Sequence, residues 1–527
     1  MRLIQVGIAD GSQVPRLVCT KFLTTSSARY SALSHCWGSS NMSLKTTRES
    51  LETHLTGFNE RDLPKTFMDA ILICRKLGIP YLWIDSLCII QDDAEDWQRE
   101  SAKMASIYRN AYLTIAAADS KDSSGGCFPQ PLKPSLHFQI RQPKTSHVLC
   151  KAFVRFPCGR GSFNGDFLGS SILSSRGWIL QELVLSRRIV YFTKDQLYWQ
   201  CNSCYTSEDG TANITRREAL RWEREEHVGK SRLLESLKLG RFGNAIFAFK
   251  TWWCWVMDFN KRQLTYTSDK LPALAGLTRY YQGQTGDKPL VGLWRCNIFN
   301  HLLWEVAEST RESGSAKTCT ARRDIPSWSW ASIDGEVSPF YHESLHYGSR
   351  NFGIPRCSKK TTPLWKRKVH PELVSTRVVW SGEPLTSVIV EARLQIRGRV
   401  LPKILKEGLL CSPEGRPWAT ASEDFVDESL ESHQVGLLDH TLEEEWFFSS
   451  GYNANFRPNF DVENTFPDET KFLCLYMTSV DQALDICLVL RPVENMEGYY
   501  RRVGTAHHFQ ASPTWYGHVE ERIIYLM

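Results

Sequence analysis

Four consecutive residues, His35, Cys36, Trp37 and Gly38, combine an imidazole, a thiol, an indole and an unhindered backbone position. Gly38 could let the main chain approach a phosphate, and Trp37 could stack on a flat ring of a ligand. His35 and Cys36 also invite a cysteine-nucleophile interpretation. Adjacent residues of a strand point to opposite faces, however, so these two cannot form a dyad. We expect Cys36 to be a small buried apolar residue, and Trp37 either to line a site or to anchor the core.

Asp85 and Ser86 follow the apolar run at residues 81–84, where a central strand meets its loop. Ligands of open α/β sheets bind at the carboxyl ends of the strands, so both residues are expected to line a cleft. The alternative is that Asp85 only caps the turn that follows it. The position at a strand end favours lining the site over a direct chemical role.

Other motifs argue against metal and nucleotide-cofactor chemistry. Cys201 and Cys204 form one CxxC spacing, and no second pair at matching spacing follows it. Structural zinc needs four ligands, so no metal site is expected. The chain also lacks the GxxxxGK(S/T) and GxGxxG patterns of ATP-binding and Rossmann cofactor sites.

Two amphipathic helices are expected between the strands that carry these residues. The first opens at Pro64 and ends at Gly78. Its apolar positions recur at steps of three and four and mark one buried face: Phe67, Ile71, Cys74 and Leu77. A cap at Asp92 or Asp93 opens the second. The apolar side of this second helix consists of Trp97, Met104 and Tyr108.

The strand patterns lie at residues 30–38, which end in a glycine turn, and at residues 81–85 and 112–117, and they alternate with these helices. This order predicts an open parallel sheet with helices on both faces. A polar insertion at about 119–170 interrupts it, and a further helix with a serine cap starts within residues 174–182. Two more strands should follow this helix. Residues 1–29 are expected to form a hairpin around the turn Asp10-Gly11-Ser12.

The 527 residues exceed what one hydrophobic core supports, so several packed units are expected. We assign an α/β domain to residues 1–210, a mainly helical, tryptophan-rich extension to 211–335, and a β-rich domain to 336–527. The segment at residues 325–332 alternates like a strand. No internal repeat is visible.

Composition points to a soluble, cytoplasmic protein. The net charge of +5 is small for this length and no Lys/Arg block stands out, so no nucleic-acid partner is expected. The first residues lack the layout of a signal peptide, and no apolar stretch is long enough for a membrane span. The 16 scattered cysteines are best explained as reduced thiols.

Three segments resemble the signature blocks of the HET (heterokaryon incompatibility) family, in the family's order and at compatible spacing. They are residues 30–38 (YSALSHCWG), 82–91 (LWIDSLCIIQ) and 175–182 (SRGWILQE). The resemblance implies programmed cell death after non-self recognition in filamentous fungi. It also implies a TIR/flavodoxin-like open parallel sheet for the N-terminal domain.

Some TIR domains cleave the nicotinamide–ribose bond of NAD with a glutamate four residues after a tryptophan. Trp178 and Glu182 have this spacing, which puts both side chains on one face of a helix. The resemblance thus implies that Glu182 is catalytic and stabilises an oxocarbenium-like state. The alternative is a helix-start glutamate that the helix dipole favours and that pairs with an arginine.

NAD would then be a substrate and not a prosthetic group. Arg176 could meet one of its phosphates or pair with Glu182, and the sequence does not separate these roles. The residues expected to contact NAD are His35, Trp37, Gly38, Asp85, Ser86, Arg176 and Trp178.

Two classes of function remain open. The first is an NAD-hydrolysing effector of cell death, in which Glu182→Ala abolishes turnover and toxicity. The second is a non-enzymatic, self-associating adaptor in the same pathway, whose toxicity tracks oligomerisation. Both imply a homo-oligomer and a separate non-self-recognition partner. A nuclease ranks last because no cluster of metal-binding carboxylates is recognisable.

Overall fold

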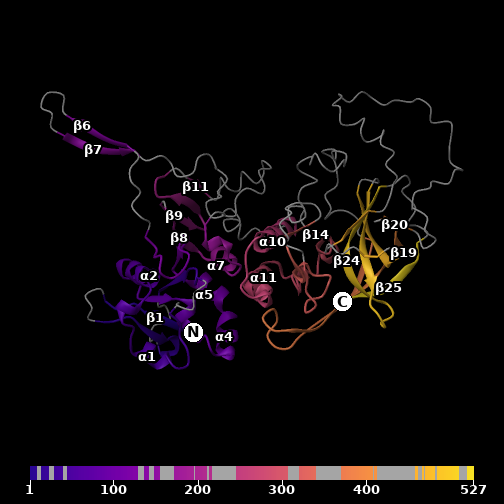
Figure 1. Cartoon of the computed structure of the whole chain (residues 1–527), viewed down its shortest axis with the longest axis horizontal. Coiled ribbons are helices and arrows are strands. Elements are labelled where there is room, and N and C mark those ends of the chain that lie inside the picture. Colours follow the sequence, from indigo (N-terminus) through magenta and orange to yellow (C-terminus); the bar gives the residue numbers. More distant parts are fainter. Residues whose placement is uncertain are drawn as a thin grey trace. The chain divides into compact units, whose positions relative to one another are not determined.

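The chain forms two compact units, residues 1–286 and 287–527. Figure 1 draws both units and labels some of their helices and strands. The computed structural model describes residues 1–8, 13–22, 29–38, 44–128, 136–141, 148–154, 171–194, 196–210, 213–215, 245–306, 320–339, 370–406, 409–411, 457–460, 466–467, 469–480, 484–509 and 519–527. No helix among these residues is long and apolar enough to cross a membrane.

A nine-stranded mixed sheet in the order β11-β10-β9-β8-β5-β3-β4-β1-β2 forms the basis of the N-terminal unit. Its strands are β1 (Arg2–Gln5), β2 (Arg16–Cys19), β3 (Tyr30–Ser34), β4 (Tyr81–Trp83), β5 (Leu113–Ala117), β8 (Arg188–Phe192), β9 (Leu197–Cys201), β10 (Cys204–Ser207) and β11 (Asn213–Thr215). The prediction of a parallel sheet holds for its centre, where β4, β3, β5 and β8 run parallel. Hairpins extend both edges with antiparallel strands, so the sheet as a whole is mixed.

Strands β1 and β2 pair as the sequence predicts, although the turn at residues 10–12 lies outside the described residues. Within the predicted insertion, β6 (Leu136–Arg141) and β7 (Val148–Val154) form a separate hairpin. The helices of this unit are α1 (Leu51–Thr56), α2 (Lys65–Lys76), α3 (Asp85–Cys88), α4 (Ala94–Ser101), α5 (Met104–Asn110), α7 (Ile179–Leu185), α10 (Ala245–Asn260) and α11 (Pro272–Thr285).

The first predicted helix is α2, with Pro64 at its N-cap and Gly78 in the left-handed conformation after its end. Three of the four predicted positions are buried, but Leu77 is 57% exposed. Leu77 is the C-cap residue, so it lies beyond the last helical turn and off the buried face. The prediction for this position was wrong.

Asp93 caps the second predicted helix by accepting hydrogen bonds from the backbone N–H groups of Glu95 and Asp96. The helix does not continue to Tyr108, because it is interrupted between α4 and α5. At the break, the Lys103 N–H bonds to the carbonyl of Glu100, three residues back, which tightens the chain into a turn. Tyr108 remains buried on α5.

Helices α10 and α11 pack against α7 and belong to the N-terminal unit. The boundary between the two units therefore falls inside the segment 211–335 that the sequence assigns to one helical extension. Trp252, Trp253 and Trp255 on α10 are almost fully buried, as expected of tryptophans that anchor a core.

The second unit is rich in β-structure, as predicted. Its main sheet consists of β18 (Glu372–Trp380), β19 (Ile389–Lys406), β20 (Leu409–Cys411), β21 (Arg457–Phe460), β22 (Lys471–Val480), β23 (Leu484–Pro492), β24 (Tyr499–Phe509) and β25 (Glu521–Leu526). Shorter elements precede it: β12 (Pro289–Leu290), β13 (Leu293–Trp294), α12 (Ile298–His301), β14 (Trp304–Val306), β15 (Thr320–Ala321), β16 (Ile333–Asp334) and β17 (Val337–Pro339). The predicted strand at 325–332 was wrong: Trp330–Ser332 form a 3₁₀ helix that the Ser329 side chain caps.

Candidate functional site

The chain directly after β3, which ends at Ser34 and not at Gly38 as predicted, places neighbouring residues against different helices. His35 meets Phe67 of α2 edge-on, with ring centroids 5.1 Å apart. Cys36 packs in an apolar cluster with Ile179 and Leu183 of α7. The two residues therefore face opposite sides of the sheet, as predicted, and burial raises the pKa of the Cys36 thiol. Cys36 is a buried apolar residue and not an activated nucleophile.

Asp85 is the central acceptor at the carboxyl ends of β3 and β4. Its Oδ2 accepts a hydrogen bond from Trp37 Nε1 at 2.8 Å, and its Oδ1 accepts one from the backbone N–H of Ser86 at 2.7 Å. The same Oδ1 lies 3.9 Å from His35 Nδ1. Two hydrogen bonds thus hold the Asp85 carboxylate, although α3, which begins at Asp85, has no side-chain cap. That Asp85 and Ser86 line a ligand site stays a prediction.

The indole of Trp37 is fixed by this bond to Asp85. The ammonium group of Lys45 lies 5.5 Å from the centroid of the Trp37 ring, in a cation–π arrangement. Trp37 therefore brings an aromatic surface and a nearby positive charge to the same edge. Its stacking on a ligand ring stays a prediction.

His35 is neutral at physiological pH. Its side chain is 2% exposed, and neither ring nitrogen has a hydrogen-bond partner. Burial lowers the pKa of His35 to about 4, and the Arg176 guanidinium acts in the same direction while Asp85 opposes both. A neutral imidazole with two unpaired nitrogens can donate one hydrogen bond and accept another.

Arg176 reaches the same edge from the segment before α7. Two backbone bonds between residues 175–177 and Gln263 hold this segment. The Arg176 guanidinium donates a hydrogen bond to the backbone carbonyl of His35. Both Arg176 and Glu182 are described by the structure and no ion pair joins them, although the charge of Arg176 lowers the pKa of Glu182. The contact of Arg176 with a ligand phosphate stays a prediction.

Glu182 lies in the first turn of α7 and is only 3% exposed. Its Oε2 has no hydrogen-bond partner. Burial and the negative charge of Asp85 raise the pKa of Glu182 to about 7, although Arg176 acts in the opposite direction. A helix-start glutamate favoured only by the dipole would have a lowered pKa, so this carboxyl is an unusual one.

The predicted serine cap of α7 is wrong. Leu173–Ser175 form a 3₁₀ turn, in which the hydroxyls of Ser171 and Ser174 bond to each other. Trp178 is the N-cap residue, and no side chain caps this helix. The Trp178 indole N–H donates a hydrogen bond to Asp269 at 3.1 Å. This N–H is the only polar group of the side chain, and it does not bond to Asp85. The structure therefore gives Trp178 a packing role and leaves its ligand contact a prediction.

Sequence reasoning missed Ser34. Its hydroxyl is fully buried and interacts with the Glu182 carboxyl, whose pKa it lowers. The Ser86 hydroxyl is fully buried without a hydrogen-bond partner. The signal for Ser34 was available: period-2 alternation places it on the Cys36 face of β3, toward α7. Buried polar atoms in native proteins are nearly always paired, so the unpaired ring nitrogens of His35 and the unpaired Ser86 hydroxyl are candidates for ligand contacts.

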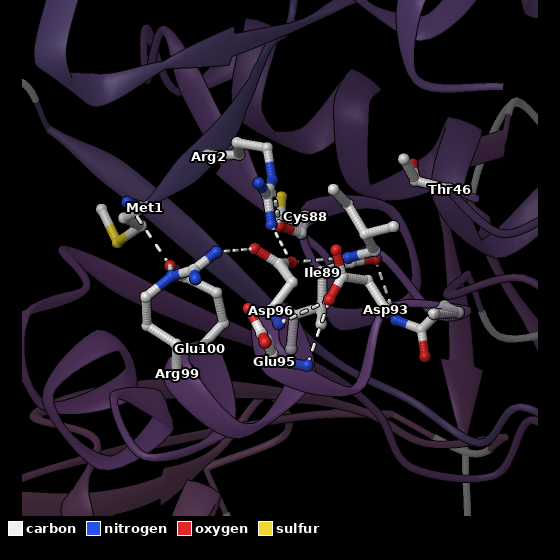
Figure 2. Close-up of polar contacts among 12 residues, drawn as sticks. Met1, Arg2, Thr46, Cys88, Ile89, Asp93, Glu95, Asp96, Arg99 and Glu100 are labelled. Carbon is white, nitrogen blue, oxygen red and sulfur yellow. Dashed lines mark hydrogen bonds and ion pairs between the residues drawn. The ribbon is translucent and has the colours of Figure 1, made fainter. Parts of the chain in front are cut away.

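A buried ionic network secures the loop that follows Asp85 (Figure 2). Asp96, on α4, is 1% exposed and accepts hydrogen bonds from Arg2, from Arg99 and, at 2.9 Å, from the Ile90 N–H. Arg2 Nε also donates to the carbonyl of Cys88 at 2.8 Å. Strand β1 and helix α4 thereby fix both ends of the 88–90 segment just beyond Asp85.

Position 38 requires a glycine because of its backbone conformation and its close neighbours. Its φ is +83°, and a Cβ there would lie 2.5 Å from Asp122 Cβ. Gly38→Ala is expected to destabilise the N-terminal unit by about 1–3 kcal/mol. Gly78→Ala is the matched control, because Gly78 has a φ of +65° but no atom lies within 4 Å of the position that an added methyl group would take. Urea unfolding that shows equal losses for both variants would contradict a steric role for Asp122.

Together these observations define a mixed α/β domain with a polar edge at the carboxyl ends of its parallel strands. Residues 30–182 match the family model described as heterokaryon incompatibility protein (HET). The match begins at the first residue of β3, ends at Glu182, and contains all three blocks found in the sequence. No curated protein and no solved structure matches the chain. Among the described residues, no group of three or more metal-ligating side chains gathers.

Proposed function

We propose that this protein is an effector of cell death in heterokaryon incompatibility that hydrolyses NAD at the edge formed by Asp85 and Glu182. The family match indicates a heterokaryon-incompatibility-related function. The enzymatic step rests on one observation: Glu182 is a buried carboxyl with an unpaired oxygen beside a second carboxylate.

The order of the parallel strands supports a TIR/flavodoxin-like ligand edge. In chain order, β3, β4, β5 and β8 are the first to fourth parallel strands, and they lie in the order second, first, third, fourth. Flavodoxin-like sheets have this order and bind ligands beside the first and third strands, at the carboxyl ends. His35 and Trp37 follow the first strand and Asp85 follows the second, and these positions support a ligand site at this edge.

The charges suit cleavage of the nicotinamide–ribose bond. Nicotinamide carries a positive charge in NAD and leaves as a neutral ring, so its departure needs no proton. The ribose then gains oxocarbenium character, which the carboxylates of Glu182 and Asp85 stabilise. With a pKa of about 7, Glu182 can also take the proton of the attacking water. Arg176 supplies positive charge for the phosphates.

The test compares nicotinamide release by the full chain and its Glu182→Gln variant, with a crowding agent to promote assembly. We expect the variant to lose at least ~100-fold in rate, since positioned acid–base groups contribute this much or more. Glu95→Gln is the matched control, because Glu95 also lies in the first turn of a helix but is exposed. It should keep full activity.

Equal NAD turnover by wild type and Glu182→Gln would contradict the proposal. So would intact NAD with assembled wild-type protein, which would favour the self-associating adaptor. Unchanged urea unfolding at pH 5, where Glu182 is protonated, would show that loss of activity in the variant does not reflect loss of the fold.

A further inference from the structure

The hairpin of β9 and β10 places two cysteines directly opposite each other. Gln200 pairs with Tyr205 in the antiparallel register, so Cys201 and Cys204 are the next pair toward the turn. Opposed residues of antiparallel strands have Cα atoms about 4.5–5.5 Å apart. Disulfides span Cα separations of about 4.4–6.8 Å, so this backbone accepts a disulfide without separating the strands.

The two sulfur atoms are already in contact, with Cys201 Sγ and Cys204 Sγ 3.7 Å apart. Both cysteines are half-buried, and the intervening Asn202 and Ser203 are exposed, so a small reagent reaches the pair. A disulfide needs the sulfurs to approach to about 2.05 Å, which side-chain rotation can supply.

The surroundings make the two thiols unequal. Burial raises the pKa of Cys201, but hydrogen bonds to its sulfur outweigh burial and lower this pKa. They come from the N–H groups of Ser203 and Cys204, from the Cys204 thiol and from the Trp199 indole. The Ser203 nitrogen lies 3.5 Å from the Cys201 sulfur. Burial and the neighbouring Cys201 sulfur raise the pKa of Cys204. Cys201 is therefore the nucleophile of the pair, and Cys204 is the thiol that holds its proton.

We propose that Cys201 and Cys204 form a redox-reactive dithiol that a hydroperoxide oxidises to a disulfide. The Cys201 thiolate attacks the peroxide, the O–O bond breaks, and a sulfenic acid and hydroxide (or alkoxide) result. The Cys204 sulfur then attacks the Cys201 sulfur, the S–O bond breaks, and the departing oxygen takes the Cys204 proton and leaves as water. Two thiols lose two electrons, and the peroxide gains them.

This dithiol is separate from the Glu182 site. Cys201 pairs with Arg188, the first residue of β8, so it lies at the amino end of that strand, whereas Asp85 follows the carboxyl end of β4. A zinc site is a weaker explanation, because zinc needs four ligands and the described residues bring no third metal-ligating side chain to the pair. The proposal therefore stands whether or not the protein hydrolyses NAD.

The test treats the reduced full chain with one equivalent of hydrogen peroxide and maps its cysteines by mass spectrometry. We expect a Cys201–Cys204 disulfide and a loss of two hydrogen atoms. In Cys204→Ser, the sulfenic acid should persist at Cys201 and be trapped by dimedone. In Cys201→Ser, oxidation at this hairpin should slow at least ~10-fold, since the activated thiolate is gone.

Cys296→Ser is the matched control. Cys296 is exposed, but burial of its sulfur and the neighbouring Asp287 raise its pKa, so its removal should leave the reaction unchanged. Preferential oxidation of Cys296, or dimedone labelling that survives Cys201→Ser at the hairpin, would overturn the proposal. Stoichiometric zinc that peroxide releases from the wild type, and that Cys201→Ser lacks, would also overturn it in favour of a metal site.

Discussion

Replacing Asp96 with alanine is expected to destabilise the N-terminal unit by about 3–5 kcal/mol, the usual effect of removing one partner of a buried ion pair. Asp96 is 1% exposed and accepts bonds from two guanidinium groups and a backbone N–H. The Arg2 side chain is 14% exposed, so without Asp96 its charge would remain largely buried with no carboxylate. The uncompensated charge of Arg2, more than the lost hydrogen bonds, explains why the expected loss of stability is so large.

The measurement is urea unfolding of the full chain, with hydrogen exchange to assign the transition to the N-terminal unit. Two units seldom unfold as one two-state system, so the peptides of β4 and α4 should be followed separately. Glu95→Ala is the control, since Glu95 neighbours Asp96 in sequence but is exposed, and its loss should change stability by less than about 0.5 kcal/mol. A loss of that small size for Asp96→Ala would show that water or Glu100 replaces the missing carboxylate.

Asp96 also shows why part of this site could not be read from the sequence. Local patterns describe α4 as an ordinary polar helix with a cap at Asp92 or Asp93, and Asp93 is the cap that the structure shows. The burial of Asp96 depends on Arg2, which is 94 positions away in the chain. The residue pattern of one helix cannot predict the ion pair between Arg2 and Asp96.

Features with a local cause were predicted well. The period of a strand places His35 and Cys36 on opposite faces, and the end of a buried strand places Asp85 at the carboxyl edge. The cap of α7 was predicted wrongly for a different reason. The hydroxyls of Ser171 and Ser174 hydrogen-bond to each other before α7 begins. Serine side chains can bond to nearby groups instead of capping a helix, and here they do so.

Protonation states, like the burial of Asp96, depend on tertiary contacts and cannot be read from the sequence. The type and position of Glu182 are visible in the HET-like block, but the pKa of this group depends on complete burial beside Asp85. The same burial acts oppositely on His35, because its charged form is the protonated one. These two shifts lead to a second large expected effect.

His35 and Glu182 should contribute opposite pH dependences of stability. The native pKa of His35 is about 4 against 6.5 for the unfolded chain, so between these values only the unfolded state takes the proton, and stability falls as pH falls. The native pKa of Glu182 is about 7 against 4.5 unfolded, so between these values only the native state keeps the proton, and stability falls as pH rises. Each effect amounts to about 3 kcal/mol over its window.

The two windows overlap between pH 4.5 and 6.5, where the opposite slopes cancel in the wild type. Glu182→Gln should therefore make the free energy of unfolding rise with pH across this range, relative to wild type, and His35→Asn should make it fall. Urea unfolding at several pH values measures both slopes, with Glu95→Gln as the control that follows the wild-type curve. In each variant, the pH dependence of the free energy of unfolding is due to the group that remains. The two variants therefore give the contributions of His35 and Glu182 separately, whereas in the wild type these contributions cancel. Curves parallel to wild type for both variants would mean that water reaches this edge and solvates His35 and Glu182, which would remove the physical basis for an activated carboxyl at Glu182.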